Sequence, residues 1–180
     1  LSEWPESSFV MDVVASLLDK SLIYPMQQGN FPRFNMLVSV SDYATMRREK
    51  TDLPGIASVH ERHAKHFATL GTSKHLASLF GRNIRPARQT HALEFQNFIE
   101  GLNQSLNTNH IETAASCVIA AIHVILFRGP YDQGRRLIQR VLSVIKTKDV
   151  TYGRLLLHHG TMLKETGRYQ DALSEYTKAI

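Results

Sequence analysis

Apolar residues recur at helical spacing along most of this chain. In residues 9–20 they stand three and four positions apart, which is the spacing of one helix face: Val10, Val13, Val14, Leu17 and Leu18. The same spacing returns in the second half of the chain, where we predict helices over 91–106, 109–127 and 131–145 and a pair of short helices over 153–180. The pattern therefore predicts a mainly α-helical protein.

One segment near the N-terminus breaks the helical pattern. Residues 22–24 and 34–37 are short strand-like pieces, and they are separated by the turn-forming residues Pro25, Gly29, Asn30 and Pro32. We predict a β-hairpin here, followed by a helix over 39–50. A helix, a hairpin and a further helix are the order found in the back half of a winged-helix domain.

The middle of the chain predicts shorter helices. Ser58 and Glu61 have the spacing of a capping box, which should open a helix that ends at Gly71. A short helix is expected around residues 74–80, and Gly81 and Pro86 indicate a loop.

The last 28 residues, Gly153 to Ile180, carry the clearest motif. Leu156, Gly160, Ala172 and Tyr176 stand at the distances that the tetratricopeptide (TPR) signature sets for a large residue, a small residue, an alanine and an aromatic. The segment therefore resembles a TPR unit. It departs from the signature by having Leu, His and Leu where Trp, Leu and Tyr are usual, at Leu156, His159 and Leu163. We expect His159 to be partly buried and hydrogen-bonded.

A repeat unit buries its apolar face against a neighbour, and a second copy is visible 38 residues earlier. With this offset Gly167 falls on Gly129 and Tyr176 falls on Ile138. The offset exceeds the roughly 34 residues of a standard TPR, so the earlier unit is a divergent one. We predict that Gly129 and Gly167 occupy equivalent corners of two helical hairpins.

These elements predict three regions: a winged-helix remnant with a β-hairpin at 1–53, spacer helices at 54–89, and TPR-like helical repeats at 90–180 with the last unit at 153–180. The predicted fold class is mainly α, with helical hairpins of a TPR-like solenoid preceded by a partial winged-helix module that has one small β-hairpin.

Four segments extend the resemblance beyond the TPR unit: VVASLLDKSLI, RFNMLVSVSDYA, ERHAKHFATLG and LEFQNFIEGLNQSL. Their order resembles the region after the nucleotide-binding module of bacterial signal-transduction ATPases with numerous domains (the STAND class), which include regulators of the AfsR and MalT types and modules attached to serine/threonine kinases. The resemblance implies that this chain spans the end of the winged helix and the first TPR-like repeats of a longer protein. It also implies that ATP binding lies upstream of Leu1.

Charge is unevenly distributed along the chain. The net charge is +5, and residues 47–88 alone hold nine basic and three acidic groups. The basic surplus includes Arg47, Arg48, Lys50, Arg62 and Lys65. Such a patch suits an acidic protein face or phosphate, whereas the simpler interpretation, which we favour, is a solvated helical surface. DNA binding by the winged helix is the alternative function, but the helix before the hairpin is acidic and apolar, which argues against nucleic acid.

No catalytic constellation stands out in the sequence. A G-x-x-x-x-G-K-[ST] phosphate loop is absent, and among the nine histidines His63 and His66 stand three apart on a helix, which is too few ligands for a metal site. The single cysteine, Cys117, lies in an apolar helix, where a thiolate is disfavoured. We predict no enzyme activity, no cofactor and no metal site in this chain.

The sequence thus predicts a non-catalytic scaffold or sensor region that binds a protein partner or adjoining domains of the same chain. In a TPR the first helix of each pair lines the concave face, so the resemblance implies contacts by Arg154, Leu157, Thr161 and Lys164; the other interpretation is that these residues face solvent or a further repeat. We also predict a cytoplasmic location, no membrane insertion, and a homodimer formed through the exposed repeat end at 176–180.

Overall fold

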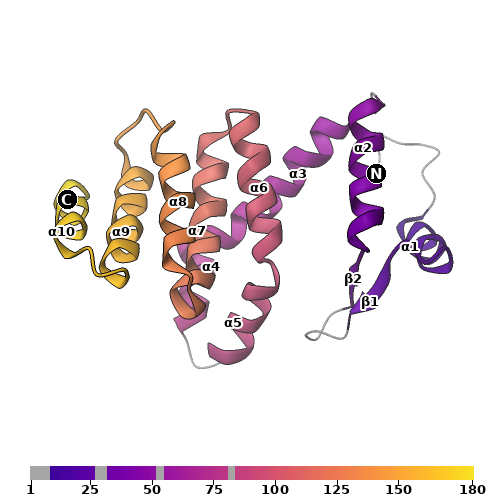
Figure 1. Cartoon of the computed structure of the whole chain (residues 1–180), viewed down its shortest axis with the longest axis horizontal. Coiled ribbons are helices and arrows are strands. Elements are labelled where there is room, and N and C mark those ends of the chain that lie inside the picture. The colour runs from indigo at the N-terminus through magenta and orange to yellow at the C-terminus, as the bar shows by residue number, and fades with distance from the viewer. Residues whose placement is uncertain (1–8, 27–31, 52–54, 81–83) are drawn as a thin grey trace. The chain divides into compact units, whose positions relative to one another are not determined.

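The structure is a computed structural model that describes residues 9–26, 32–51, 55–80 and 84–180. The chain divides into two compact units, Leu1–Pro54 and Gly55–Ile180, and each is described by itself. The predicted fold class is confirmed, because the described residues are mainly helical with one small antiparallel hairpin (Figure 1). With η for 3₁₀ helices, the elements are α1 (Val10–Asp19), β1 (Tyr24–Met26), β2 (Arg33–Asn35), α2 (Val38–Lys50), α3 (Ile56–Ala68), η1 (Thr69–Gly71), α4 (Ser73–Ala77), η2 (Ser78–Phe80), α5 (Ile84–Leu93), α6 (Phe95–Asn107), α7 (Ile111–Arg128), α8 (Tyr131–Leu142), α9 (Val150–Glu165) and α10 (Tyr169–Lys178).

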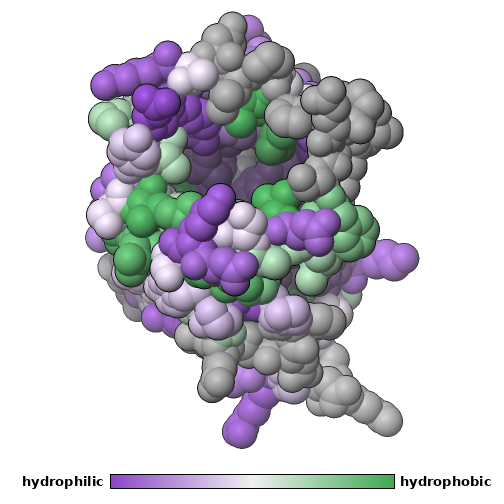
Figure 2. All heavy atoms as spheres, turned by 90° about the vertical axis from the view of Figure 1, so that its right-hand side faces the viewer, coloured by the Kyte–Doolittle hydropathy of each residue, from purple (hydrophilic) through white to green (hydrophobic). Residues whose placement is uncertain are grey.

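The N-terminal unit consists of α1, the hairpin and α2. Strands β1 and β2 are antiparallel, with Tyr24 opposite Asn35 and Met26 opposite Arg33. None of the described residues of this unit is buried, and apolar side chains such as that of Val38 are largely exposed. The space-filling view shows hydrophobic side chains, in green, among hydrophilic ones on the face turned to the viewer (Figure 2). The order of helix, hairpin and helix follows the prediction, but the described residues form no hydrophobic core.

The start and the end of α3 differ from the prediction. The helix begins at Ile56, directly after Gly55 in the left-handed region (φ 78°), so the expected capping box at Ser58 is wrong. Ser58 lies inside the helix instead, where its hydroxyl accepts a hydrogen bond from Arg62 (2.6 Å). Contrary to the prediction, Gly71 does not end the helix in a left-handed conformation. It is needed instead because its backbone packs closely against α7. A Cβ added there would lie 1.9 Å from the backbone oxygen of Ser116 in α7, so the backbone of η1 touches α7 directly.

The single helix expected over residues 91–106 is two helices. The chain leaves helical geometry at Glu94 (φ −89°, ψ 3°), which ends α5 and precedes α6. Pro86 lies in the first turn of α5, where proline is tolerated because those N–H groups have no partner within the helix. The break lets the two helices pack on different neighbours, since α5 packs mainly on η2 and α6 packs on α3 and α7.

Helix α7 is the centre of the C-terminal unit. Ten of its residues are buried, and it packs against α3, α6, α8 and α9. By length and hydropathy α7 could cross a membrane, but more than half of it is buried inside the unit, as is usual for a core helix. Helix α3, which we expected in a spacer, packs on α6 and α7, and its Ala64 contacts the core at Gly101 and Cys117.

The last four helices stack in sequence order, α7 on α8, α8 on α9 and α9 on α10, and α7 also touches α9 (Figure 1). Gly129 and Gly167 lie at the corners of the α7–α8 and α9–α10 hairpins, both with left-handed φ values (67° and 78°). The second corner is a Schellman turn, in which the N–H of Arg168 donates to Leu163 (2.9 Å) and that of Gly167 to Lys164 (3.0 Å).

The ends of three of these helices differ from the prediction. Helix α8 ends at Leu142 rather than at residue 145, and α7 begins after His110, which makes no side-chain cap. The linker spans residues 143–149 instead of 146–151, because Asp149 caps α9, accepting a hydrogen bond from the N–H of Tyr152 (3.0 Å).

Candidate functional site

Two of the four residues predicted to contact a partner are held inside the C-terminal unit. Arg154 is half-buried, and its Nη2 donates to the backbone oxygen of Gly71 at 3.3 Å, which ties α9 to η1. Thr161 is also half-buried; its hydroxyl donates to the backbone oxygen of Leu157 (2.9 Å) and accepts from Tyr176 (3.3 Å). Their hydrogen-bonding groups therefore hold the unit together.

The other two predicted contact residues are exposed on the same helix. Leu157 is 46% exposed, and the exposed Lys164 pairs with Glu165 at 2.9 Å. An ion pair between exposed neighbours contributes little to stability, so Lys164 is free to exchange Glu165 for another carboxylate. The accessible part of this face is therefore one leucine and one lysine.

The basic patch is split between the two units. Arg47, Arg48 and Lys50 lie in the last turn of α2, where positive charge suits the negative end of the helix dipole. Arg62 and Lys65 lie on α3 in the other unit.

The basic side chains of α3 have local partners. Arg62 donates to Ser58, and Lys65 pairs with Glu61 at 2.6 Å, one helical turn away. The hydrogen bond from Lys65 lowers the pKa of the exposed Glu61. These contacts are typical of a solvated helix face.

Cys117 is packed in the core. Its Sγ lies 3.6 Å from the backbone oxygen of Ala64, and burial raises the pKa of the thiol to about 12. The thiol is therefore protonated at neutral pH and a poor nucleophile.

The histidine pair on α3 has neighbours other than a metal ligand set. His63 Nε2 lies 3.4 Å from Asn97 Oδ1, and the rings of His63 and His66 both lie against Phe67. In the part of the chain that the structure describes, no three His, Cys, Asp or Glu residues are grouped to hold a metal ion.

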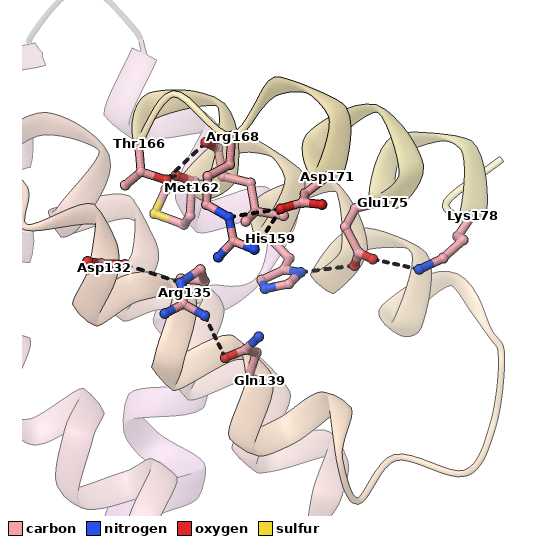
Figure 3. A network of polar contacts seen from close by, with 11 residues as sticks. Asp132, Arg135, Gln139, His159, Met162, Thr166, Arg168, Asp171, Glu175 and Lys178 are labelled. Atoms are coloured by element: carbon pink, nitrogen blue, oxygen red, sulfur yellow. Dashed lines mark hydrogen bonds and ion pairs between the residues drawn. The ribbon is translucent and has the colours of Figure 1, made fainter.

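His159 forms a hydrogen bond, as predicted, and its partner lies on the other helix of the hairpin. The ring is 7% exposed, and Nδ1 donates to Glu175 Oε2 at 2.9 Å, while Lys178 donates to the other carboxylate oxygen at 2.8 Å (Figure 3). Burial raises the pKa of Glu175, but the hydrogen bonds from Lys178 and His159 together lower it by more than burial raises it. The pKa of Glu175 is therefore below its usual value. The network joins α9 to α10.

Helix α10 exposes two large apolar side chains on one side. Tyr169 is 68% exposed and Leu173 is 61% exposed, and they stand one helical turn apart. They widen the apolar face that α10 already turns toward α9 through the buried Ala172. The TPR signature did not single out either residue, because it is defined by the buried positions.

No protein-family model, curated protein or solved structure matches this chain. The candidate functional site is therefore defined by its own geometry as the exposed surface of the α9–α10 hairpin.

Proposed function

We propose that this chain is a non-catalytic helical scaffold that binds a protein partner through the α9–α10 hairpin, as part of a larger cytoplasmic signalling or regulatory ATPase. The sequence resemblance to STAND-class proteins suggests the larger context. The stacked hairpins supply the support from the structure, because proteins of this architecture commonly bind partners on extended surfaces.

The observation that carries the proposal is the exposed apolar strip of Tyr169 and Leu173 on α10. In the stack, α8 is covered by α7 and by α9, whereas α10 packs mainly on α9. A helix from a partner that packs beside α10 would cover the strip in the way that α9 covers α8. Burying a leucine or tyrosine side chain contributes roughly 1.5–3 kcal/mol, which is enough for these two residues to anchor a contact.

Charge around the strip favours an amphipathic partner helix over a highly charged one. Arg168 pairs with Asp171 at 2.6 Å, and Lys178 pairs with Glu175 at 2.8 Å, so the ionic groups of α10 largely satisfy one another. The partner is therefore expected to contribute apolar residues at helical spacing, the mode in which a helix lies in an apolar groove.

The test is recovery of a partner by the full chain, followed by calorimetry with that partner in purified form. Leu173→Asp should weaken binding at least about tenfold, because the contact would bury an unpaired carboxylate. Ser174→Asp places the same charge on a neighbouring exposed position and should leave the affinity within about twofold of the parent.

Leu157→Asp separates the two faces of the hairpin. Loss of binding with this variant and not with Leu173→Asp would place the partner on the α9 face and refute the role of α10. Absence of any specific protein partner, together with DNA binding that weakens steeply with salt, would refute the scaffold proposal in favour of a DNA-binding regulator.

A further inference from the structure

A cavity of about 190 Å³ lies between η2, α5 and α7, and its charged lining is entirely cationic. Arg85 and Arg88 come from one side of α5, and Arg128 comes from the last turn of α7. No described aspartate or glutamate lines this cavity. The larger cavity at the N-terminus of α7 differs in this respect, because Glu112 and Asp149 line it together with a lysine.

Arg88 is held in place with part of its hydrogen-bonding capacity unused. Its Nε donates to the backbone oxygen of Leu79 at 3.0 Å, and its guanidinium carbon lies 3.6 Å from the centre of the Phe127 ring and 5.5 Å from that of Phe80. No described residue accepts a hydrogen bond from its two terminal nitrogens. A guanidinium fixed in this way loses little further conformational entropy when it binds an anion.

The other two arginines are exposed, and no described carboxylate forms an ion pair with either. Arg85 stands one turn before Arg88 on α5, so the two side chains share a helix side, while Arg128 reaches the cavity from a segment 40 residues further along. Three guanidinium groups around one small cavity repel one another unless an anion lies between them.

A buried histidine in the same lining lacks one hydrogen-bond partner. His91 is 4% exposed, and its Nε2 lies 2.9 Å from the backbone oxygen of Ala120, so Nε2 is the donor. Burial lowers the pKa of His91, which keeps the ring neutral and leaves Nδ1 as an acceptor. Nδ1 has no described partner. The ring of His91 is therefore a neutral, polar part of the wall and adds no positive charge to that of the three arginines.

We propose that this cavity binds a small phosphomonoester. A phosphate dianion matches several guanidinium groups better than a single carboxylate does, because three oxygens can accept paired N–H donors. The volume suits a phosphate with a few additional heavy atoms, since pockets for drug-sized ligands are typically about 300–1,000 Å³. The partly exposed Phe127 and the side chain of Val124 provide the apolar wall.

Glycerol 3-phosphate is the probe, and isothermal titration calorimetry of the full chain at low ionic strength is the measurement. We expect saturable binding of one ligand per chain, tighter than that of inorganic phosphate and of acetate. Backbone amide NMR shifts should change in α5 and in the last turns of α7. Failure to saturate, or acetate binding of equal affinity, would overturn the proposal.

Exposed arginines allow variants that preserve the fold. Arg85→Gln and Arg128→Gln should each weaken the binding of glycerol 3-phosphate by about tenfold, whereas Arg136→Gln, which removes the same charge from exposed α8, should change it less than about twofold. Equal weakening by all three variants would show general charge attraction only. A phosphoserine peptide that binds at least about tenfold more tightly than glycerol 3-phosphate would show that the site receives a phosphorylated protein, which contradicts the small-molecule assignment.

Discussion

The α7–α8 and α9–α10 hairpins turn at equivalent glycines but have differently filled cores. Both turn at a glycine with positive φ, and α8 and α10 begin at positions 38 residues apart, Tyr131 and Tyr169. With that offset, residues 120–122 of α7 read Ala-Ala-Ile and residues 158–160 of α9 read His-His-Gly. The comparison shows which features of a hairpin the stack requires and which it leaves open.

The two hairpins carry their small residue on opposite helices. In the second hairpin the small residue is Gly160 on the first helix, and a Cβ there would lie 2.6 Å from the ring of Tyr176. In the first hairpin the small residue is Gly134 on the second helix, and a Cβ there would lie 3.1 Å from Ile122. Ile122 occupies the position of Gly160, so close packing is achieved with the large residue on opposite helices.

The two hairpins also differ in polarity at positions that correspond under the 38-residue offset. His159 and Glu175 correspond to Ala121 and Leu137, so a hydrogen-bonded pair stands where the first hairpin has two buried apolar residues. A satisfied polar pair can be as stable as an apolar pair, but only while both partners remain. The stack therefore requires complementary neighbours and does not fix their chemistry.

The largest effect is expected when an isoleucine from the first hairpin is placed in the second. Gly160→Ile should destabilise the protein by about 3 kcal/mol, because the new side chain occupies the volume of the Tyr176 ring and must displace it. Urea unfolding followed by circular dichroism measures the loss, and hydrogen exchange of the α9 and α10 amides localises it.

Changing the residues that pack around Gly160 as well tests whether the packing of the first hairpin can be transferred to the second. The triple variant Gly160→Ile, Ala172→Gly and Tyr176→Ile reproduces the small and large positions of the first hairpin and should recover at least half of the lost stability. A triple variant less stable than Gly160→Ile would show that the two cores are not interchangeable.

The next largest effect is a loss of stability in acid caused by His158, whose counterpart in the first hairpin is the buried Ala120. Burial, and then the charges of His123 and Arg154, lower the pKa of His158 to about 4. Between the unfolded pKa of about 6.5 and this value the unfolded chain binds a proton that the folded chain does not, so stability should fall with falling pH by up to about 3 kcal/mol.

The variant His158→Gln isolates this contribution, because glutamine is polar and does not titrate. Its stability should fall less than that of the parent between pH 6.5 and pH 4, while both proteins lose stability through the other buried histidines with lowered pKa values, among them His91 and His123. Parallel stability curves for the two proteins over this range would contradict the assignment to His158.

The sequence pattern was sufficient for local features of the fold. Helical spacing and glycine position predicted the stacked hairpins and both corners, because these depend on residues close together in the chain. It failed at the break between α5 and α6, where Glu94 interrupts an apolar pattern that runs on without a glycine or proline. The pattern records which residues are apolar, whereas the break depends on packing against two different neighbours.

Contacts between distant residues could not be predicted. The hydrogen bond of His159 was expected, but its partner Glu175 lies 16 residues away on another helix. Arg85 and Arg88 were visible as basic residues, and only the packing of α5 near the end of α7 brings Arg128 to the same cavity. Likewise, Arg154 had the position of a partner-binding residue, and only the structure shows its bond to Gly71.

An intermediate effect is expected from breaking the polar pair of the second hairpin. His159→Ala should cost about 2 kcal/mol, because Glu175 then stays largely buried with Lys178 as its remaining partner. Thermal and urea unfolding at pH 7 measure the loss.

The double variant His159→Ala, Glu175→Leu places the corresponding residues of the first hairpin, Ala121 and Leu137, at these two positions. It should be more stable than His159→Ala alone, because it removes the carboxylate that the single variant leaves without its histidine. If the double variant loses as much stability as the sum of the two single variants, the two residues do not act as a pair.

The smallest effect is expected from an alanine at the small residue of the first hairpin, Gly134. It allows a direct comparison with the same substitution at Gly160 in the second hairpin. Gly134→Ala brings a Cβ to 2.7 Å from Met162 Sδ, but a methionine side chain is flexible and can move away. The helix propensity of alanine contributes about 1 kcal/mol relative to glycine and should offset the crowding, leaving stability within about 1 kcal/mol of the parent. Gly160→Ala gains the same propensity and meets the rigid ring of Tyr176, so it should be the less stable of the two variants. Equal stabilities in urea unfolding would show that the identity of the neighbouring side chain does not decide the cost.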